Sequence, residues 1–199
     1  MVKLDLSSAI SALKNGDIIV YPTDTLYGLG ADIFNESAIR KIFEIKKRSF
    51  SNPLSVAVSN INELEKIAYL NDASRSLAKV FLPGSLTLVL KKRSVISDIV
   101  TAGLDKVAIR IPDNNIALEL LSEFGPITAT SANIHGEKTP VLIKDISMQF
   151  KEKDISVYLD IGRLAGKPST IVDTTDEHVK ILRVGSISEK KILEAIKYG

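Results

Sequence analysis

Residues 107–130, VAIRIPDNNIALELLSEFGPITAT, decide the fold class, because two apolar runs lie on either side of a helical pattern. Residues 107–111 form one strand-like run, and residues 127–130 form the other. Between them, Asn115–Phe124 has apolar side chains three and four positions apart and is followed by Gly125, which predicts a helix that ends there. A strand, a helix and a strand in succession indicate α/β layer packing.

The same alternation extends outward along most of the chain. A polar loop is expected at residues 23–30, and Asn35 is expected to cap a helix. Several short strands follow one another in the last third, which favours a mixed sheet in a single domain over residues 1–199. Further strands are expected at residues 18–21, 54–58, 87–90, 157–159, 171–172 and 181–182, and further helices at residues 4–13, 60–68, 72–81, 143–150 and from 188 onward.

Composition and charge narrow the classes of function. The 26 basic residues nearly balance the 24 acidic ones, so the chain lacks the strong positive field of a nucleic-acid binder. The absence of cysteine excludes disulfides, thiolate catalysis and zinc sites that use sulfur. His135 and His178 are far apart in the sequence, so we expect no metal site built from protein residues alone. No apolar stretch approaches the roughly 18 residues of a membrane span, so we expect a cytoplasmic protein.

Residues 162–169, GRLAGKPS, are the stretch that comes nearest to a phosphate-binding loop. The spacing of the two glycines is one residue short of that motif, and Pro168 stands where the magnesium-binding hydroxyl is required. No amphipathic helix follows to direct its N-terminus at a phosphate. The stretch is therefore expected to be a turn between strands.

Two segments early in the chain gather polar or cationic side chains beside expected strands, where ligand sites collect in open α/β sheets. Residues 21–30, YPTDTLYGLG, combine hydroxyls with glycines that allow close approach to a small ligand, although such a loop is also an ordinary turn. Residues 46–48, KKR, with Asn52 nearby, form a cationic helix end. Cations at that position also compensate the helix dipole in many proteins.

Two later segments have the same character. Arg110 lies between apolar residues in an expected strand, so its guanidinium needs an anionic partner. Two partners fit equally well. One is the carboxylate or phosphate of a ligand, and the other is an acidic residue of the chain itself. Residues 128–133, TATSAN, offer hydroxyls and an amide that can surround a ligand, or that form a simple Asx or Ser/Thr turn.

Taken in order, these segments resemble the YrdC-like family of threonylcarbamoyl-AMP synthases over nearly the whole chain. Residues 21–28 are similar to that family's opening signature, residues 46–48 to its Lys-x-Arg element, and residues 131–133 to its Ser-x-Asn element. Similar runs also occur at residues 83–87 (PGSLT), 110–112 (RIP), 168–170 (PST) and 182–185 (LRVG). Seven such elements in register are hard to obtain by chance.

The resemblance implies a twisted open mixed sheet flanked by helices, with a concave basic cavity for ATP, Mg²⁺ and L-threonine. It implies that Lys46 and Arg48, with magnesium, offset phosphate charge in catalysis, and that Arg110 pairs with the threonine carboxylate. Ala132 and Pro140 are expected to contribute backbone contacts. The implied threonine contacts are Thr25, Arg110, Thr130 and Ser169, and the implied nucleotide contacts are Lys46, Arg48, Asn52, Lys106, Ser131, Ala132, Asn133, Pro140 and Arg183.

The implied reaction joins threonine, bicarbonate and ATP into threonylcarbamoyl-adenylate and releases pyrophosphate. A separate threonylcarbamoyl transferase would then use the adenylate to modify tRNA. The family comparison also shows two departures. Some members have a histidine where residues 56–58 read Val-Ala-Val, so the resemblance implies that threonine is held without it or less tightly. With its last residue at Gly199, the chain is also expected to lack the C-terminal domain of longer members.

Two alternatives remain open on the sequence. The first is a module that binds double-stranded RNA or tRNA without catalysis, which the net charge of +2 argues against only weakly. The second is carbamoyl transfer in hydrogenase maturation, since a related domain occurs in those multidomain proteins. The chain lacks the acylphosphatase-like and zinc-finger segments that accompany it there.

Overall fold

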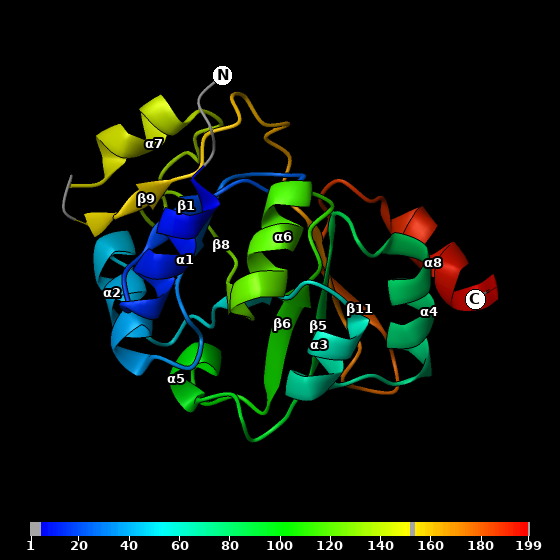
Figure 1. Cartoon of the computed structure of the whole chain (residues 1–199). Helices are drawn as coiled ribbons and strands as arrows, with labels where there is room; N and C mark the ends of the chain where they lie inside the picture. Colours follow the sequence, from blue (N-terminus) through cyan, green and yellow to red (C-terminus); the bar gives the residue numbers. More distant parts are fainter. Residues whose placement is uncertain (1–4, 152–153, 199) are drawn as a thin grey trace.

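The computed structural model describes residues 5–151 and 154–198, in which helices surround two β-sheets (Figure 1). The chain begins with α1 (Leu6–Lys14), whose first turn is capped by the Asp5 carboxylate through a 3.0 Å bond from the Ser8 amide. The predicted helix at residues 4–13 is thus confirmed within the described residues, whereas Leu4 lies outside them. Within the described part of the chain, no helix has the length and apolar character needed to cross a membrane.

The smaller sheet has four strands in the order β8-β2-β1-β9. Its central strands, β1 (Ile19–Tyr21) and β2 (Gly28–Gly30), are antiparallel, with Val20 opposite Leu29. The outer strands are β8 (Thr130–Ser131), antiparallel to β2, and β9 (Val157–Tyr158), parallel to β1. The expected loop at residues 23–30 was therefore wrong over its last three residues. Glycine is depleted in strands, so β2 has no apolar pattern to reveal it.

The larger sheet has seven strands and mixes parallel and antiparallel neighbours, as predicted. Its centre is β5 (Leu86–Lys92) beside β6 (Lys106–Arg110), an antiparallel pair. The parallel neighbours are β10 (Thr170–Asp173) on β5 and β3 (Ser55–Ala57) on β6. The remaining strands are β11 (Lys180–Arg183) on β10, β7 (Ile127–Thr128) on β3 and β4 (Ala68–Tyr69) on β5.

The run at residues 127–130, expected to form one strand, instead supplies a strand to each sheet. Ile127–Thr128 pairs with β3, and Thr130–Ser131 pairs with β2. Ala129 carries the chain between the sheets, and its amide donates to the Ser55 carbonyl at 2.7 Å. The single sheet expected from the sequence is thus two sheets that meet at this crossing.

Seven helices in the described residues cover these sheets after α1. Asn35 caps α2 through a 3.1 Å bond from the Ala38 amide, as the sequence predicted. Asn60 caps α3 through a 3.0 Å bond from the Glu63 amide. Helices α4 and α8 lie side by side (Figure 1). The helices are α2 (Glu36–Lys46), α3 (Ile61–Ile67), α4 (Asp72–Phe81), α5 (Asp98–Thr101), α6 (Asn115–Phe124), α7 (Ile143–Gln149) and α8 (Glu189–Tyr198).

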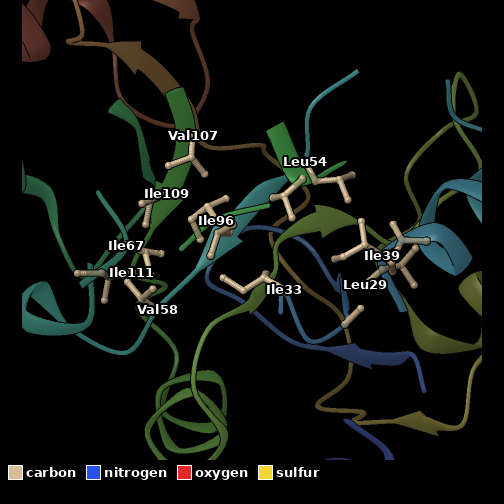
Figure 2. Close-up of a cluster of buried hydrophobic side chains, with 14 of the residues drawn as sticks. Leu29, Ile33, Ile39, Leu54, Val58, Ile67, Ile96, Val107, Ile109 and Ile111 are labelled. Atoms are coloured by element: carbon tan, nitrogen blue, oxygen red, sulfur yellow. The ribbon is translucent and has the colours of Figure 1, made fainter. Parts of the chain in front are cut away.

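One apolar core joins the two sheets (Figure 2). Leu29 of β2, Ile39 of α2 and Ile109 of β6 belong to the same cluster, and each is fully buried. Burying one such side chain contributes about 1.5 to 3 kcal/mol. Because successive strand residues face opposite sides, Ile109 points into this core while its neighbours Ala108 and Arg110 face the other side of the sheet. The core therefore fixes the strands whose opposite face carries the site.

Candidate active site

A cleft of about 670 Å³ lies where the two sheets meet, within the usual size range of small-molecule sites. Its lining comes from β1, β2 and the turn between them, from β3, β5, β6, β8, β10 and β11, and from loops around residues 138 and 168. All the charged side chains in the lining are cations, namely Arg48, Arg110, Lys138 and Arg183. The cleft is therefore suited to an anionic ligand.

The floor of the cleft is the face of the larger sheet that points away from the core around Ile109. Thr87 lies opposite Ile171 of β10, and Val89 lies opposite Ala108 of β6. Arg110 is two positions beyond Ala108 and so faces the same side. Strand alternation thus places hydroxyl, apolar and cationic groups on one surface.

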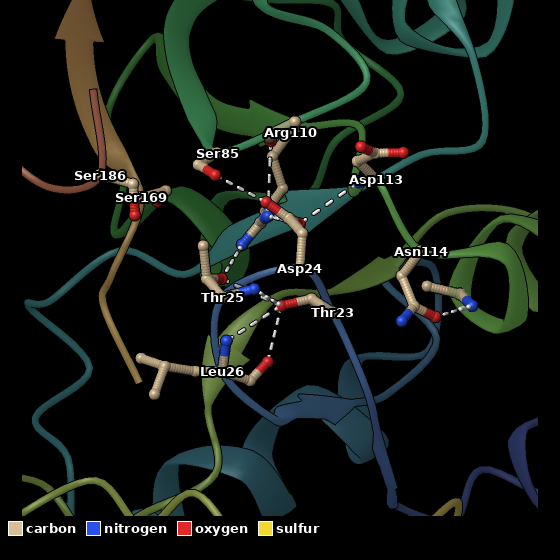
Figure 3. A network of polar contacts seen from close by, with 12 residues as sticks. Thr23, Asp24, Thr25, Leu26, Ser85, Arg110, Asp113, Asn114, Ser169 and Ser186 are labelled. Carbon is tan, nitrogen blue, oxygen red and sulfur yellow. Dashed lines mark hydrogen bonds and ion pairs between the residues drawn. The ribbon is translucent and has the colours of Figure 1, made fainter. Parts of the chain in front are cut away.

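The turn between β1 and β2 brings Thr25 to Arg110. The Thr23 hydroxyl organises this turn, because it donates to the Leu26 carbonyl at 2.6 Å and accepts from the Thr25 and Leu26 amides at 3.2 Å (Figure 3). Thr25 Oγ1 then accepts from Arg110 Nη1 at 2.9 Å. Gly28 is required just after the turn, since a Cβ there would lie 2.9 Å from the Tyr21 ring.

Arg110 is buried, 5% exposed, and has a carboxylate partner within the chain. Its Nη2 forms an ion pair with Asp24 and also donates to the Gly84 carbonyl at 3.5 Å. Its Nε is buried and has no hydrogen-bond partner among the described residues. Of the two partners that the sequence left open, the structure shows the internal acidic residue, while the side chain still lines the cleft.

Lys46 lies behind the cleft wall and joins two predicted motif elements. Its side chain is 1% exposed, and its Nζ donates to the carbonyls of Ser131 at 2.5 Å and Asn133 at 2.7 Å. The His135 amide returns a 2.8 Å bond to the Lys46 carbonyl. Burial, and then the nearby Arg48 charge, lowers the pKa of Lys46 to about 7. Lys46 therefore holds the Ser-x-Asn element against the end of α2.

Arg48 reaches the cleft because the chain leaves α2 at Lys47, which adopts a left-handed conformation with φ 52°. Arg48 Nε donates to the Asn52 carbonyl at 3.2 Å, and its Nη2 donates to the Pro53 carbonyl at 2.9 Å. Burial lowers the pKa of this guanidinium below its ordinary value. Asn52 thus contributes its backbone to the placement of Arg48.

Arg183 and Ser169 form a further part of the wall. Arg183 donates to the Ser169 carbonyl from Nε at 3.1 Å and from Nη2 at 2.9 Å. The Ser169 hydroxyl lies 2.8 Å from the Thr87 hydroxyl. Burial, and then the charge of Arg110, lowers the pKa of Arg183. Gly185 permits this packing, because a Cβ there would collide with the Pro168 carbonyl oxygen.

The structure brings together most of the site residues predicted from the sequence. Asn133 lies next to the cleft, where its side-chain oxygen accepts from the Ser131 hydroxyl at 2.5 Å, and the Ala132 amide donates to the Tyr27 carbonyl at 2.9 Å. Lys106 instead pairs with Asp173 at 2.8 Å. The predicted residues that line the cleft are Thr25, Arg48, Arg110, Thr130, Ser131, Ser169 and Arg183, whereas Lys46, Asn52, Lys106, Ala132, Asn133 and Pro140 are outside its lining.

Residues 162–169 lead into strand β10 rather than into a helix, as their departures from the phosphate-loop motif indicated. They nevertheless contribute to the site. The Gly166 amide donates to the Thr25 carbonyl at 3.0 Å, and Gly166, Pro168 and Ser169 line the cleft.

Sequence reasoning gave no role to several residues of the cleft or its surroundings. Strand alternation could have placed Thr87 on the cleft side, because it lies two residues before Val89 in an expected strand and so faces the same side of the sheet. Asp24 and Ser85 stood inside quoted motifs but carried no assigned partner. Lys138 and Thr139 lie in a loop, where no periodic pattern identifies them.

The described residues contain no group of three or more histidine, aspartate or glutamate side chains that could hold a metal ion. The Asp24 carboxylate, which pairs with the cleft residue Arg110, also accepts from the Ser85 hydroxyl. These residues do not fit a magnesium ion bound by the protein itself.

Comparison with known proteins agrees with this geometry. The family model Sua5/YciO/YrdC, described as telomere recombination, matches residues 11–185. A putative threonylcarbamoyl-AMP synthase of Methanocaldococcus jannaschii is 43% identical over 181 residues, which are 90% of this chain and 85% of that protein. The threonylcarbamoyl-AMP synthase of Pyrococcus abyssi is 39% identical over 192 residues, 94% of this chain but 56% of that protein.

A solved structure supports the same relationship. The crystal structure of P. abyssi Sua5 complexed with L-threonine superposes with a TM-score of 0.91 at 36% identity, covering 96% of this chain and 57% of that one. The chain thus spans little more than half of the P. abyssi protein and most of the M. jannaschii protein. Because the family model covers most of the sequence and the fold agrees, the chain belongs to the Sua5/YciO/YrdC family.

Proposed function

We propose that this chain is a threonylcarbamoyl-AMP synthase, which forms threonylcarbamoyl-adenylate and pyrophosphate from L-threonine, bicarbonate and ATP. The observation that carries the proposal is the cleft itself, where buried Arg110 is paired with a carboxylate and the hydrogen bonds that Arg48 and Arg183 make in the described chain go to neutral oxygens. Relatives with this enzyme name match 90% and 94% of the chain. The adenylate would serve a separate transferase that modifies tRNA, and contact with tRNA would occur at that later step.

The amino-acid end of the cleft is the region around Arg110. A guanidinium pairs well with a carboxylate, so Arg110 would bind the threonine carboxylate. Hydroxyl groups of Thr25, Thr130 and Ser169 line the same cleft and offer neutral hydrogen bonds to the rest of the substrate. The P. abyssi relative, whose crystal structure contains L-threonine, supports an amino-acid site in this fold.

The nucleotide end is the region around Arg48 and Arg183. Both guanidiniums line the cleft and donate to backbone carbonyls, so their charges are available to phosphate oxygens. Lys46 adds a third cation behind Ser131. Magnesium would arrive bound to the ATP phosphates, since the residues that the structure describes include no cluster of three or more metal-ligating side chains.

The proposed chemistry needs no covalent enzyme intermediate. The threonine amine attacks the carbon of bicarbonate and water is lost, which gives a carbamate. A carbamate oxygen then attacks the α-phosphorus of ATP, the bond to the bridging oxygen breaks, and pyrophosphate leaves. The cleft would contribute by orienting the two substrates and offsetting phosphate charge.

The first experiment is a pyrophosphate-release assay with purified protein, ATP and Mg²⁺. We expect release only when L-threonine and bicarbonate are both present, and we expect no requirement for RNA. Serine in place of threonine tests the amino-acid site. Equal release with serine, or release that depends on added RNA, would contradict the proposal.

A further inference from the structure

We infer that Asp24 is a positioning residue that holds Arg110 in the orientation needed to receive the amino-acid carboxylate. The inference rests on the proposed function, because it concerns the partner of the threonine carboxylate. Asp24 itself is outside the cleft lining, whereas Arg110 is part of it. Asp24 would therefore act through Arg110.

Three groups hold the Asp24 carboxylate in place (Figure 3). One oxygen accepts from Arg110 Nη2 and, at 3.3 Å, from the Asp113 amide. The other oxygen accepts from the Ser85 hydroxyl at 2.9 Å. The side chain of Asp24 is only 12% exposed. A carboxylate with these fixed donors provides a rigid support for the guanidinium.

The guanidinium is held on two of its three nitrogens. Thr25 Oγ1 accepts from Nη1 at 2.9 Å, and Asp24 accepts from Nη2. Two such anchors fix both the position of the group and the rotation of its plane. Nε is buried and has no hydrogen-bond partner in the described chain, so the donors offered to an incoming carboxylate would be the remaining N–H groups of Nη1 and Nη2.

The charge of Asp24 also suits the expected ligand. Arg110 and Asp24 together carry no net charge, and an amino acid in its zwitterionic form carries none either. An arginine without such a partner would attract phosphate groups as readily as a carboxylate. Asp24 therefore offsets the charge of Arg110, whereas the hydrogen bonds that Arg48 and Arg183 make in the described chain go to neutral oxygens.

The test is steady-state kinetics of pyrophosphate release for Asp24→Asn. Asparagine has the same shape but removes the charge-assisted bond, so we expect the KM for threonine to rise about tenfold or more. The KM for ATP should change less than about twofold, because the nucleotide cations are untouched. A change in fold alone would affect both KM values.

Two further variants make the test specific. Asp113→Asn is the matched control, since its exposed carboxylate is adjacent to the same network but only its backbone amide contacts Asp24. We expect its KM for threonine to stay within about twofold of wild type. Ser85→Ala removes the hydroxyl that holds the second Asp24 oxygen, and should raise the KM for threonine about two- to fivefold.

The outcomes separate this inference from the proposed function. Wild-type protein that releases no pyrophosphate with threonine and bicarbonate would refute the proposed function. Active wild type with an unchanged threonine KM in Asp24→Asn, or with equal rises for threonine and ATP, would overturn the role of Asp24 alone. If circular dichroism shows that Asp24→Asn is unfolded, Ser85→Ala decides, and an unchanged threonine KM in that variant would overturn the inference.

Discussion

The cations at the two proposed ends of the cleft differ in their partners within the chain. At the amino-acid end, Arg110 is paired with the carboxylate of Asp24. At the nucleotide end, the hydrogen bonds of Lys46, Arg48 and Arg183 that the described chain provides go to carbonyl and hydroxyl oxygens. A zwitterionic amino acid carries no net charge and can be held by a neutral ion pair, whereas a triphosphate is attracted by cations that are still uncompensated. The difference between the ends therefore matches the difference between the proposed substrates.

The uncompensated cations are held at a cost to the folded state. Burial lowers the pKa of Lys46 to about 7 and also lowers the pKa values of Arg48 and Arg183. A buried cation without a counterion is destabilised, and an anionic ligand relieves that destabilisation. At the proposed nucleotide end, binding of a phosphate group would therefore relieve this destabilisation.

The largest effect should come from Arg110→Lys, which keeps the charge and removes the planar fork. We expect threonine affinity to fall about 10- to 100-fold, since a lysine cannot hold Thr25, Asp24 and the ligand carboxylate together. ATP affinity should change far less. Calorimetric titration of each substrate measures both values, with Arg93→Lys as control because Arg93 stacks on Tyr69, outside the cleft lining. A greater loss for ATP than for threonine would reverse the assignment of the two ends.

A smaller effect concerns Lys46, whose folded-state pKa of about 7 lies below its ordinary value of 10.5. Between these pH values the unfolded chain binds more protons, so the wild-type free energy of unfolding should rise with pH relative to Lys46→Met. We expect a relative gain of about 2 kcal/mol from pH 7 to pH 9, with the full penalty present below pH 7. Urea unfolding at several pH values measures it.

The control for this measurement is Lys66→Met. The Lys66 side chain is 67% exposed and pairs with Glu63 on the surface of α3. The difference between that variant and wild type should stay flat over the same pH range, because an exposed pair contributes little. A flat profile for Lys46→Met as well would show that Lys46 remains fully protonated in the fold.

Most helices of this fold were predicted within one or two residues of their bounds, whereas the short helix α5 was not predicted. Asp72–Phe81 and Asn115–Phe124 follow from apolar spacing and from end signals that lie within a few residues of each helix. Strand β2, with three residues, was missed, and strand β8, with two residues, was merged with β7. Neither strand has an apolar alternation that would reveal it. The pairing of β8 with β2 joins segments about 100 positions apart, which local patterns do not contain.

For the site too, some features could be predicted from the sequence and others required the folded structure. That Arg110 needs an anionic partner follows from its apolar neighbours, and the sequence supported that much. That the partner is Asp24, 86 positions away, depends on how the β1–β2 turn packs against β6. Likewise, the Lys-x-Arg and Ser-x-Asn elements were each recognised by resemblance. Their connection through Lys46 Nζ and the Ser131 carbonyl required the folded chain.

The smallest effect should be the dependence of substrate affinity on salt concentration. Measuring it compares the two ends of the cleft in the wild-type protein, without any mutation. Uncompensated cations attract a polyanion over a distance that salt shortens, from about 10 Å at 0.1 M to about 3 Å at 1 M. We expect ATP affinity to fall about three- to fivefold between 0.05 and 0.5 M KCl, and threonine affinity to change by less than about 1.5-fold. A zwitterion at a neutral ion pair gains nothing from the long-range field, because the two opposite contributions cancel. Isothermal titration of each substrate across the salt series measures both slopes. Equal slopes in the wild-type protein would mean that Asp24 does not neutralise the amino-acid end. In Asp24→Asn, threonine binding should become salt-dependent, so the difference between the two slopes should shrink.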